Sequence, residues 1–547
     1  MTVAQISRVH ARDRVAVSRT YHRVAGANVL VYEPARRAPG AEDLMVVSMH
    51  GGLNPSLESA FLESVASYGV RTAFCVPDKS SFIDQFRSMD ACMALFRELT
   101  GTIVLMGQSR GAALMSGYQK IAENGSHVFQ GPERRLPIPD LHLRPADGLM
   151  LLDANFGTTV MHVMSLNPAL VAEGNAVRID PTLDATNPAN GYAPDGGCSF
   201  DEEFKSRFLS AQRARYLALL DAAQERLDAI ARGDGDYADN EPFIVPDGIG
   251  INDSPKLFAG DLRLLSHTRK PWPLIHRDGS ITTGIVPCVR TDENNPGFAG
   301  KLAAAFVSTV RDYLWSEVTV REDYDYGEDF LSGIDFESSF TCSSGNVAMI
   351  SCPLLLMGHT GGYEYIAAEW SHDRAASEDT TIAFLEGATH GWTPVDAQIY
   401  GDTLGLEARY VVQWVTAPGR FAPAEEDAAE RSGSAEPDAS PGDIVALRAR
   451  LVGEWVGATT SQRARFSLGG GSELGFAEAL TRFEIMPDGS LRLHDRYGDT
   501  VSARLTSDPL RAAVEPGAYY LDDDTLVLQT VALHRAGDDA EVREPHG

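Results

Sequence analysis

The 547-residue sequence predicts an α/β fold with a mostly parallel sheet, followed by a small all-β region at the C-terminal end. Helix-like and strand-like runs alternate up to residue 153, which is the pattern of βα units in a parallel sheet. One strand-like run leads directly into the motif Gly-x-Ser-x-Gly at 107–111 and then into a helix-like run. Beyond residue 414 the composition changes abruptly, which indicates a second unit.

The runs of the first part can be assigned in chain order. A hairpin is expected at 18–34, strands at 44–49, 70–76, 102–106, 148–152, 353–357 and 381–385, and helices at 57–68, 82–99 and 112–118. Between residues 156 and 345 the alternation is lost. The stretches 180–196 and 240–255 look irregular, the segment 271–287 follows them, and the sheet pattern is expected to return only at residue 350. One helix is clear there, at 201–232, because Ser199-x-x-Glu202 has the form of a capping box and Gly233 is a typical stop.

Ser109, the serine of the Gly-x-Ser-x-Gly motif, has the setting of a catalytic nucleophile. A serine between a buried strand and a helix lies on a tight turn, and small residues two places to either side let the backbone pass. The helix N-terminus that follows favours developing negative charge. The alternative is an ordinary glycine-rich βα turn whose serine has no special role.

The loop after the strand at 44–49 predicts an oxyanion hole. It reads His50-Gly51-Gly52, and glycine leaves the backbone N–H groups of such a turn unshielded. Acyl transfer needs two N–H donors that point at the tetrahedral oxyanion. We expect Gly52 or Leu53 to supply one donor and Arg110, the residue after the serine, to supply the other. The side chain of His50 is expected to brace the loop.

A third motif supplies a candidate general base. His390 follows the strand at 381–385, between Gly387 and Gly391, where its ring can turn toward a serine on a neighbouring strand. Taken in order, these three motifs resemble the α/β-hydrolase family over roughly residues 15–416. The resemblance implies a mostly parallel sheet flanked by helices, with a Ser-acid-His triad above the strand ends. It leaves the substrate open, because one fold hosts many chemistries.

The acid of the triad has three candidates. The family usually places an aspartate shortly after the strand that here spans 353–357, but this chain has no carboxylate at 358–362. Asp153 closes the strand that follows the serine helix, and some family members take their acid from that strand. Glu364 lies in the expected loop, a little late, and Glu369 lies later still. We favour Asp153, although an aspartate at a strand end often only caps the next turn.

Composition narrows the functional class. A hydrophobic content of 44% with 22% charged residues is ordinary for a globular protein, and a net charge of −29 argues against nucleic acid and anionic membranes as partners. No apolar stretch reaches the length of a membrane span, and no apolar signal core follows Met1. Six cysteines without CxxC spacing indicate reduced thiols, so a cytoplasmic location is expected.

The chain is expected to divide into three parts. Residues 1–421 form the hydrolase domain, in which 156–345 is interpreted as a cap inserted over the pocket. Residues 422–443 are rich in Ala, Pro, Glu, Asp, Ser and Gly, which predicts a flexible acidic linker. Residues 444–547 show short alternating strands and turn signals, which predict a small antiparallel barrel or sandwich of accessory role. This tail faintly resembles the lipocalin-like barrels.

Taken together, the motifs predict a serine hydrolase that needs no cofactor or metal. The run Asp323-x-Asp325-x-Gly327 opens like a calcium loop but has Ile334 at the twelfth position, so we interpret it as a solvated acidic turn. Nucleotide-binding and HExxH patterns are lacking. The expected substrate is a small molecule with an ester, lactone or amide bond. An acyltransferase or a C–C bond hydrolase would use the same residues, and a binding protein on a hydrolase scaffold is the non-enzymatic alternative.

Overall fold

The computed structural model describes residues 14–50, 56–79, 81–130, 134–173, 178–193, 197–247, 257–291, 305–362 and 364–421, together with the backbone of short strands between 453 and 535. Within these ranges the main body is built on one large sheet with helices on both faces. The fold class predicted from the sequence, a mostly parallel α/β sheet, is confirmed. No helix in the described parts of the chain is both long enough and apolar enough to cross a bilayer.

The central sheet has the strand order β1-β2-β4-β3-β5-β6-β13-β14-β8-β9. The strands are β1 (Val17–Val24), β2 (Ala27–Pro34), β4 (Arg71–Pro77), β3 (Leu44–Met49), β5 (Thr102–Gln108), β6 (Gly148–Leu152), β13 (Leu354–His359), β14 (Thr380–Leu385), β8 (His267–Ile275) and β9 (Ile281–Pro287). The pairs from β4 to β8 are parallel, whereas β1–β2, β2–β4 and β8–β9 are antiparallel. The expected leading hairpin is therefore present.

Two apolar clusters lie on the two faces of this sheet. Successive side chains of a strand point to opposite faces, so Met45 and Val47 join one cluster and Val46 joins the other. Helices α2 (Phe82–Leu99), α3 (Arg110–Asn124) and α9 (Ala367–Arg374) contribute to the first cluster. Helices α1 (Ser56–Ser67) and α11 (Thr403–Val415) contribute to the second. Because the strands are parallel, their carboxyl ends meet at one edge of the sheet.

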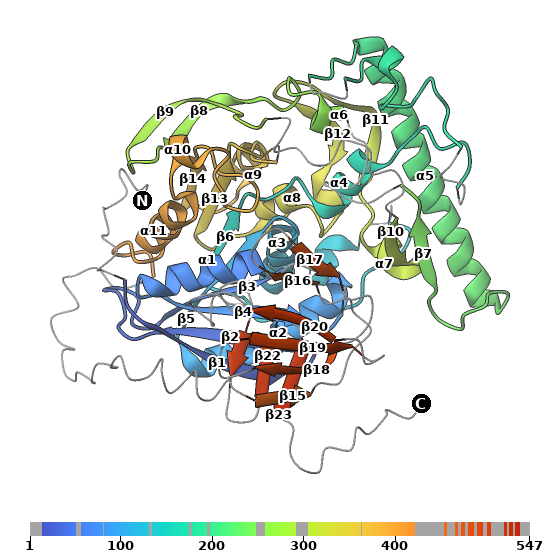
Figure 1. Cartoon of the computed structure of the whole chain (residues 1–547). Coiled ribbons are helices and arrows are strands. Elements are labelled where there is room, and N and C mark those ends of the chain that lie inside the picture. The colour runs from blue at the N-terminus through green and yellow to red at the C-terminus, as the bar shows by residue number, and fades with distance from the viewer. Residues whose placement is uncertain are drawn as a thin grey trace.

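Residues 156–345, interpreted as a cap, divide into several small elements. They comprise α4 (Thr158–Ser165), α5 (Glu202–Arg232), α6 (Leu257–Gly260), α7 (Val310–Trp315), α8 (Ser343–Asn346), the pair β7 (Pro242–Val245) with β10 (Phe306–Thr309), the pair β11 (Thr319–Tyr326) with β12 (Leu331–Asp335), and the hairpin β8–β9. Figure 1 shows hairpin β8–β9 and helix α5 on opposite sides of the molecule. The hairpin extends the central sheet beyond β14.

Local expectations in this segment need three corrections. The sheet pattern does not wait until residue 350, because residues 271–287 already belong to hairpin β8–β9 of the central sheet, whose few buried side chains hide the strand pattern. Helix α5 begins after Asp201, whose carboxylate accepts the backbone N–H of Phe204 at 2.7 Å, so Ser199 is not its cap. The predicted end is confirmed, because Gly233 takes the left-handed conformation at φ 77°. Residues 323–326 of the expected acidic turn lie in strand β11, and only residues 327–330 form the connection to β12.

In the C-terminal region the described backbone forms an antiparallel sheet with the order β20-β19-β18-β15-β23-β22-β21. Its strands are β15 (Gly453–Val456), β18 (Leu480–Ile485), β19 (Ser490–Asp495), β20 (Thr500–Arg504), β21 (Tyr519–Leu521), β22 (Thr525–Leu528) and β23 (Val531–Arg535). A separate pair joins β16 (Arg465–Leu468) and β17 (Ser472–Gly475). The predicted linker at 422–443 lies outside the described residues.

Candidate active site

Ser109 lies at the turn between β5 and α3, at the edge of the sheet where the parallel strands end. Its backbone has φ 53° and ψ −123°, a conformation that a residue with a side chain rarely adopts. The motif glycines make this turn possible. A Cβ on Gly107 would lie 2.3 Å from the carbonyl oxygen of Gly111, and a Cβ on Gly111 would lie 3.3 Å from Cα of His50. The predicted strand–serine–helix turn is therefore present in the structure.

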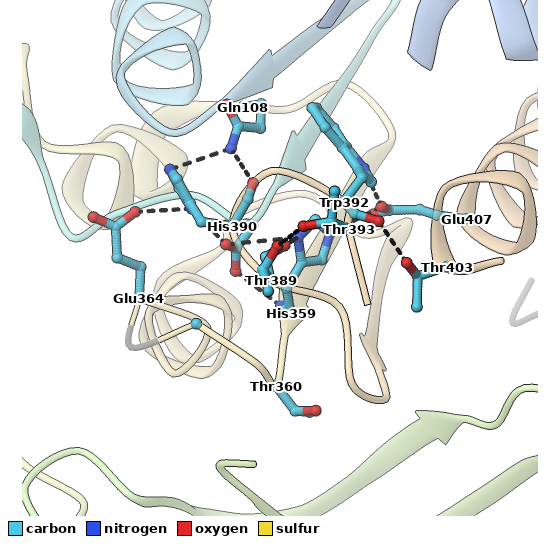
Figure 2. Close-up of polar contacts among 12 residues, drawn as sticks. Gln108, His359, Thr360, Glu364, Thr389, His390, Trp392, Thr393, Thr403 and Glu407 are labelled. Atoms are coloured by element: carbon cyan, nitrogen blue, oxygen red, sulfur yellow. Dashed lines mark hydrogen bonds and ion pairs between the residues drawn. The ribbon is translucent and has the colours of Figure 1, made fainter. Parts of the chain in front are cut away.

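His390 lies in the loop after β14, and both of its ring nitrogens have partners. Nδ1 lies 2.6 Å from Oδ2 of Asp153, the residue that directly follows β6. Nε2 lies 3.2 Å from the side-chain amide nitrogen of Gln108, which also donates to the backbone oxygen of His390 at 2.8 Å. Figure 2 shows the imidazole of His390 between Gln108 and Glu364.

These contacts define the tautomer of His390. An ionised carboxylate only accepts hydrogen bonds, so Nδ1 carries the proton that it donates to Asp153. The amide nitrogen of Gln108 only donates, so Nε2 is the acceptor. A neutral ring with a bare Nε2 is the form that a general base requires. The Ser109 hydroxyl makes no hydrogen bond with a described residue, but its chain neighbour Gln108 contacts this nitrogen directly.

The three candidate acids lie in different places. Asp153 is completely buried and makes the short contact with Nδ1 of His390. Oε2 of Glu364 lies 3.3 Å from the same nitrogen. Glu369 points elsewhere, since it accepts the backbone N–H groups of Arg269 and Lys270 at 3.0 and 2.9 Å. Glu369 therefore fastens α9 to β8, and the structure brings only Asp153 and Glu364 to the imidazole.

The charges around the imidazole alter two pKa values. Burial alone would raise the pKa of Asp153, but the charge of His359 and the hydrogen bond from His390 outweigh it, and the net pKa lies below the ordinary value. Burial alone would lower the pKa of His390, but Glu364 and Asp153 outweigh it, and the net pKa is raised. Asp153 is therefore an anion near neutral pH, and His390 becomes neutral only at a higher pH than an ordinary histidine.

Two buried residues behind Asp153 were missed by the sequence analysis. His359, the last residue of β13, donates its backbone N–H to Oδ1 of Asp153 at 2.8 Å, and its ring lies 2.8 Å from Oε2 of Glu407 on α11. Both side chains are completely buried. The signal in the sequence was His359 itself, which occupies the place where a carboxylate was expected. Nothing local points to Glu407, which is 48 residues further along the chain.

The expected oxyanion hole is described only in part. Gly52 and Leu53 lie outside the described residues, whereas Arg110 is the first residue of α3, where backbone N–H groups have no partner within the helix. Nη1 of Arg110 donates to the backbone oxygen of His50 at 3.0 Å, which ties the two loops together. Burial, and then the charges of Arg110 and His390, lower the pKa of His50 to about 3, so His50 is neutral.

Glu58 is a third residue that the sequence analysis missed. It lies on α1, is 2% exposed, and accepts a hydrogen bond from the backbone N–H of Gln108. Burial raises its pKa to about 8, against which the bonds from Gln108 and Ser48 act only weakly. Glu58 is thus largely protonated at neutral pH, and it supports the turn that carries Ser109 from below.

A cavity of about 420 Å³ is lined by Arg110, the residue after Ser109, but not by Ser109 or His390 themselves. Arg110 forms part of its wall, together with aromatic, aliphatic and hydroxyl side chains from α2, α4, β10 and α7 that include Phe82, Thr158, His162 and Tyr313. The cavity wall also contains the carboxylate of Asp312, which accepts hydrogen bonds from the hydroxyls of Ser81 and Thr309, each at 2.7 Å. Across the described residues, no group of three or more His, Cys, Asp and Glu side chains has the arrangement of a metal site.

No family model and no curated protein sequence matches this chain. Among solved structures, it is similar to an esterase named E25, with 12% identity, coverage of 74% of this chain and 78% of that one, and a TM-score of 0.30. It is similar to a haloalkane dehalogenase loop variant from Bradyrhizobium elkanii, with 12% identity, coverage of 76% and 100%, and a TM-score of 0.31. It is also similar to a monoacylglycerol lipase of Paleococcus ferrophilus, with 11% identity, coverage of 74% of this chain and 99% of that one, and a TM-score of 0.29. At these TM-scores the similarities say nothing about the activity of this chain.

Proposed function

We propose that this chain is a serine hydrolase that cleaves a carboxylic ester, or a related lactone or amide, through an acyl-enzyme on Ser109. The observation that carries the proposal is the pair of contacts at the ring of His390. Nδ1 lies 2.6 Å from Asp153 and Nε2 lies at Gln108, one residue from the strained serine. These contacts support the role of His390 as a base, because a ring held by a carboxylate at Nδ1 can accept a serine proton at Nε2.

In the proposed mechanism the Ser109 hydroxyl replaces the Gln108 amide at Nε2 of His390 when substrate binds. His390 takes the hydroxyl proton as the serine oxygen attacks the substrate carbonyl, and Asp153 stabilises the imidazolium that results. The oxyanion is held by the backbone N–H of Arg110 and by Gly52 or Leu53. His390 then protonates the leaving group and later activates water, which releases the acid. Loss of one oxyanion donor typically costs about 3–4 kcal/mol in such reactions.

The cavity beside Arg110 is the proposed substrate chamber. Its volume of about 420 Å³ falls in the range of small-molecule sites, and its walls of Phe82, Phe306 and Tyr313 favour a medium-sized, partly apolar group. The walls come from the core helices and from the segment 156–345, which supports the interpretation of that segment as a cap. A series of p-nitrophenyl esters of increasing acyl length tests this, since KM is expected to fall as the acyl chain fills the chamber.

The decisive experiment is active-site labelling with a fluorophosphonate. Mass spectrometry of the labelled protein should place the phosphonate on Ser109, because only an activated serine attacks phosphorus quickly. Ser109→Ala should abolish labelling and lower kcat by several orders of magnitude. Ser67→Ala is the matched control, since the Ser67 hydroxyl bonds only to the backbone oxygen of Ser64 in the neighbouring turn, at 2.7 Å.

The outcomes separate the alternatives. Turnover that survives in Ser109→Ala contradicts the proposed nucleophile. A labelled Ser109 with turnover only when an alcohol or amine acceptor is added assigns an acyltransferase, and cleavage of a β-diketone rather than an ester assigns a C–C bond hydrolase. A folded protein that is not labelled assigns a binding protein on a hydrolase scaffold.

A further inference from the structure

His359 has acceptor atoms at both ring nitrogens. Nδ1 lies 3.0 Å from the backbone oxygen of Thr389, and Nε2 lies 2.8 Å from Oε2 of Glu407. A carbonyl oxygen and an ionised carboxylate oxygen accept hydrogen bonds and donate none. Both nitrogens of His359 must therefore carry protons for both bonds to form, and the ring is then an imidazolium cation. Figure 2 shows His359 with Thr389 and Glu407.

This cation lies between two buried carboxylates. Nδ1 of His359 is 3.6 Å from Oδ2 of Asp153, the oxygen that also binds His390, while Glu407 lies at the other ring nitrogen. The side chains of His359, Asp153 and Glu407 are all completely buried. Unpaired ions are costly in such a place, so each charge here depends on its neighbours.

Glu407 is fixed by a second donor. The indole Nε1 of Trp392 donates to the same oxygen, Oε2, that binds His359. Thr389 and Trp392 lie on either side of His390 in the same loop. His359 bonds to Thr389 and Glu407 accepts a bond from Trp392, so the pair holds this loop on both sides of His390. The group thus links three elements: the end of β13, helix α11 and the loop after β14.

We propose that His359 is a positioning residue, a buried imidazolium paired with Glu407 that keeps Asp153 ionised and holds the His390 loop in place. Asp153 supplies the carboxylate at His390, and His359 lies behind it as the neighbouring cation. Its effect on catalysis rests on the proposed hydrolase function, whereas its protonation does not. The same neighbours set the pKa of His359: burial lowers it, but Glu407 and Asp153 outweigh burial and raise the pKa to about 9.

The protonation of His359 depends on the charged groups that face its ring. They are Asp153 at the end of β6, Glu407 on α11, and His390 and Glu364 in the two loops beside it. Asp153 and Glu407 favour the charged form of His359. The cation in turn lowers the pKa of His390, which Glu364 and Asp153 raise. Removal of the cation should therefore raise the pKa of His390 further.

The first test measures the protonation state directly. Ring ¹⁵N shifts are recorded by NMR on protein labelled at histidine, with the His359 signals assigned by their loss in His359→Gln. We expect both nitrogens of His359 to stay protonated from pH 6 to about pH 8.5 and to titrate near pH 9. In Glu407→Gln the midpoint should fall by about one unit or more, because the nearest negative charge is gone. A neutral ring at pH 7 in the wild type overturns the proposal.

The second test is kinetic and uses a matched control. His359→Gln should lower kcat by up to about 10²-fold with little change in KM, since the residue orients the triad without touching substrate. The acid limb of the kcat profile should move to higher pH. His276→Gln is the control, because His276 forms a similar pair with Glu386 at 2.8 Å but bonds on its other side to Thr282, away from the triad.

The outcomes keep the two proposals apart. Equal kcat and equal acid limbs in His359→Gln and His276→Gln overturn the positioning role. Should His359→Gln fail to fold, the wild-type and Glu407→Gln titrations still decide whether the cation exists. An unlabelled Ser109 together with a protonated His359 would reject the hydrolase function and leave the buried ion pair standing.

Discussion

Replacement of Asp153 by asparagine is the sharpest perturbation of this site. Each carboxylate oxygen accepts an N–H: Oδ1 from the backbone of His359 at 2.8 Å and Oδ2 from Nδ1 of His390 at 2.6 Å. Asparagine has a single side-chain acceptor, so its NH₂ group must face one of these two donors. If the NH₂ faces His390, the ring adopts the other tautomer, with the proton on Nε2, and cannot take the proton of Ser109.

The size of the effect follows from this geometry. An asparagine in place of the triad acid of a serine protease lowers kcat by about 10⁴-fold, and we expect a similar fall here because the short contact and the burial are alike. A 10⁴-fold fall corresponds to about 5.4 kcal/mol in activation free energy. KM should change little, since Asp153 is buried behind His390 and does not touch substrate.

Glu364→Gln should act differently. At 3.3 Å from Nδ1, Glu364 contributes mainly its charge, which raises the pKa of His390. His390 must be neutral to act as a base, so kcat falls at low pH as His390 becomes protonated. A raised pKa of His390 places this acid limb of the kcat profile at higher pH. Removal of this charge should move the acid limb to lower pH, with a fall in kcat of no more than about tenfold on the plateau. Glu369→Gln should leave kcat nearly unchanged and lower Tm, because Glu369 fastens α9 to β8.

The assay is kcat and KM on one p-nitrophenyl ester from pH 5 to 10 for the three amide variants, with Tm as a check on folding. The reasoning is refuted if Asp153→Asn keeps kcat within tenfold of the wild type. A fall of 10³-fold or more in Glu364→Gln alone would move the role of the triad acid to the loop after β13.

Two further predictions concern stability and domain structure. Glu58 keeps its proton in the folded state up to about pH 8, whereas in the unfolded chain it loses the proton near its ordinary pKa of 4.5, so this group lowers the free energy of unfolding as pH rises toward 8. The Tm of Glu58→Gln should therefore exceed that of the wild type by more at pH 8 than at pH 5. An equal difference at both pH values contradicts the raised pKa of Glu58. A chain that stops after Phe421 should stay folded with unchanged kcat, since the Phe421 ring packs against Gly148 at the start of β6 and so closes the core around the central sheet. Lost turnover or precipitation would mean that the C-terminal strands belong to that core.

Local sequence was sufficient to identify the elements that carry Ser109 and His390. The turn at Ser109 depends partly on close contacts within the motif, such as Gly107 against Gly111 and Ala112, so much of the cause of its geometry lies in the motif itself. Buried parallel strands are continuous apolar runs, which is why β3, β5 and β6 could be predicted. Hairpin β8–β9 gave no such run, because it lies at the sheet edge, is largely exposed and contains Pro271 and Pro273.

Only the tertiary structure decided which charges meet. Asp153, Glu364 and Glu369 each follow or begin an element near the same edge of the sheet, and their spacing along the chain does not tell which of them reaches His390. The pairing of His359 with Glu407 joins β13 to α11 across 48 residues. Such contacts arise from how the helices pack on the sheet, and burial then changes each pKa through neighbours that the sequence does not place side by side. The local sequence thus placed Ser109 and His390 at strand ends, and only the packing brought Asp153 to His390 and His359 to Glu407.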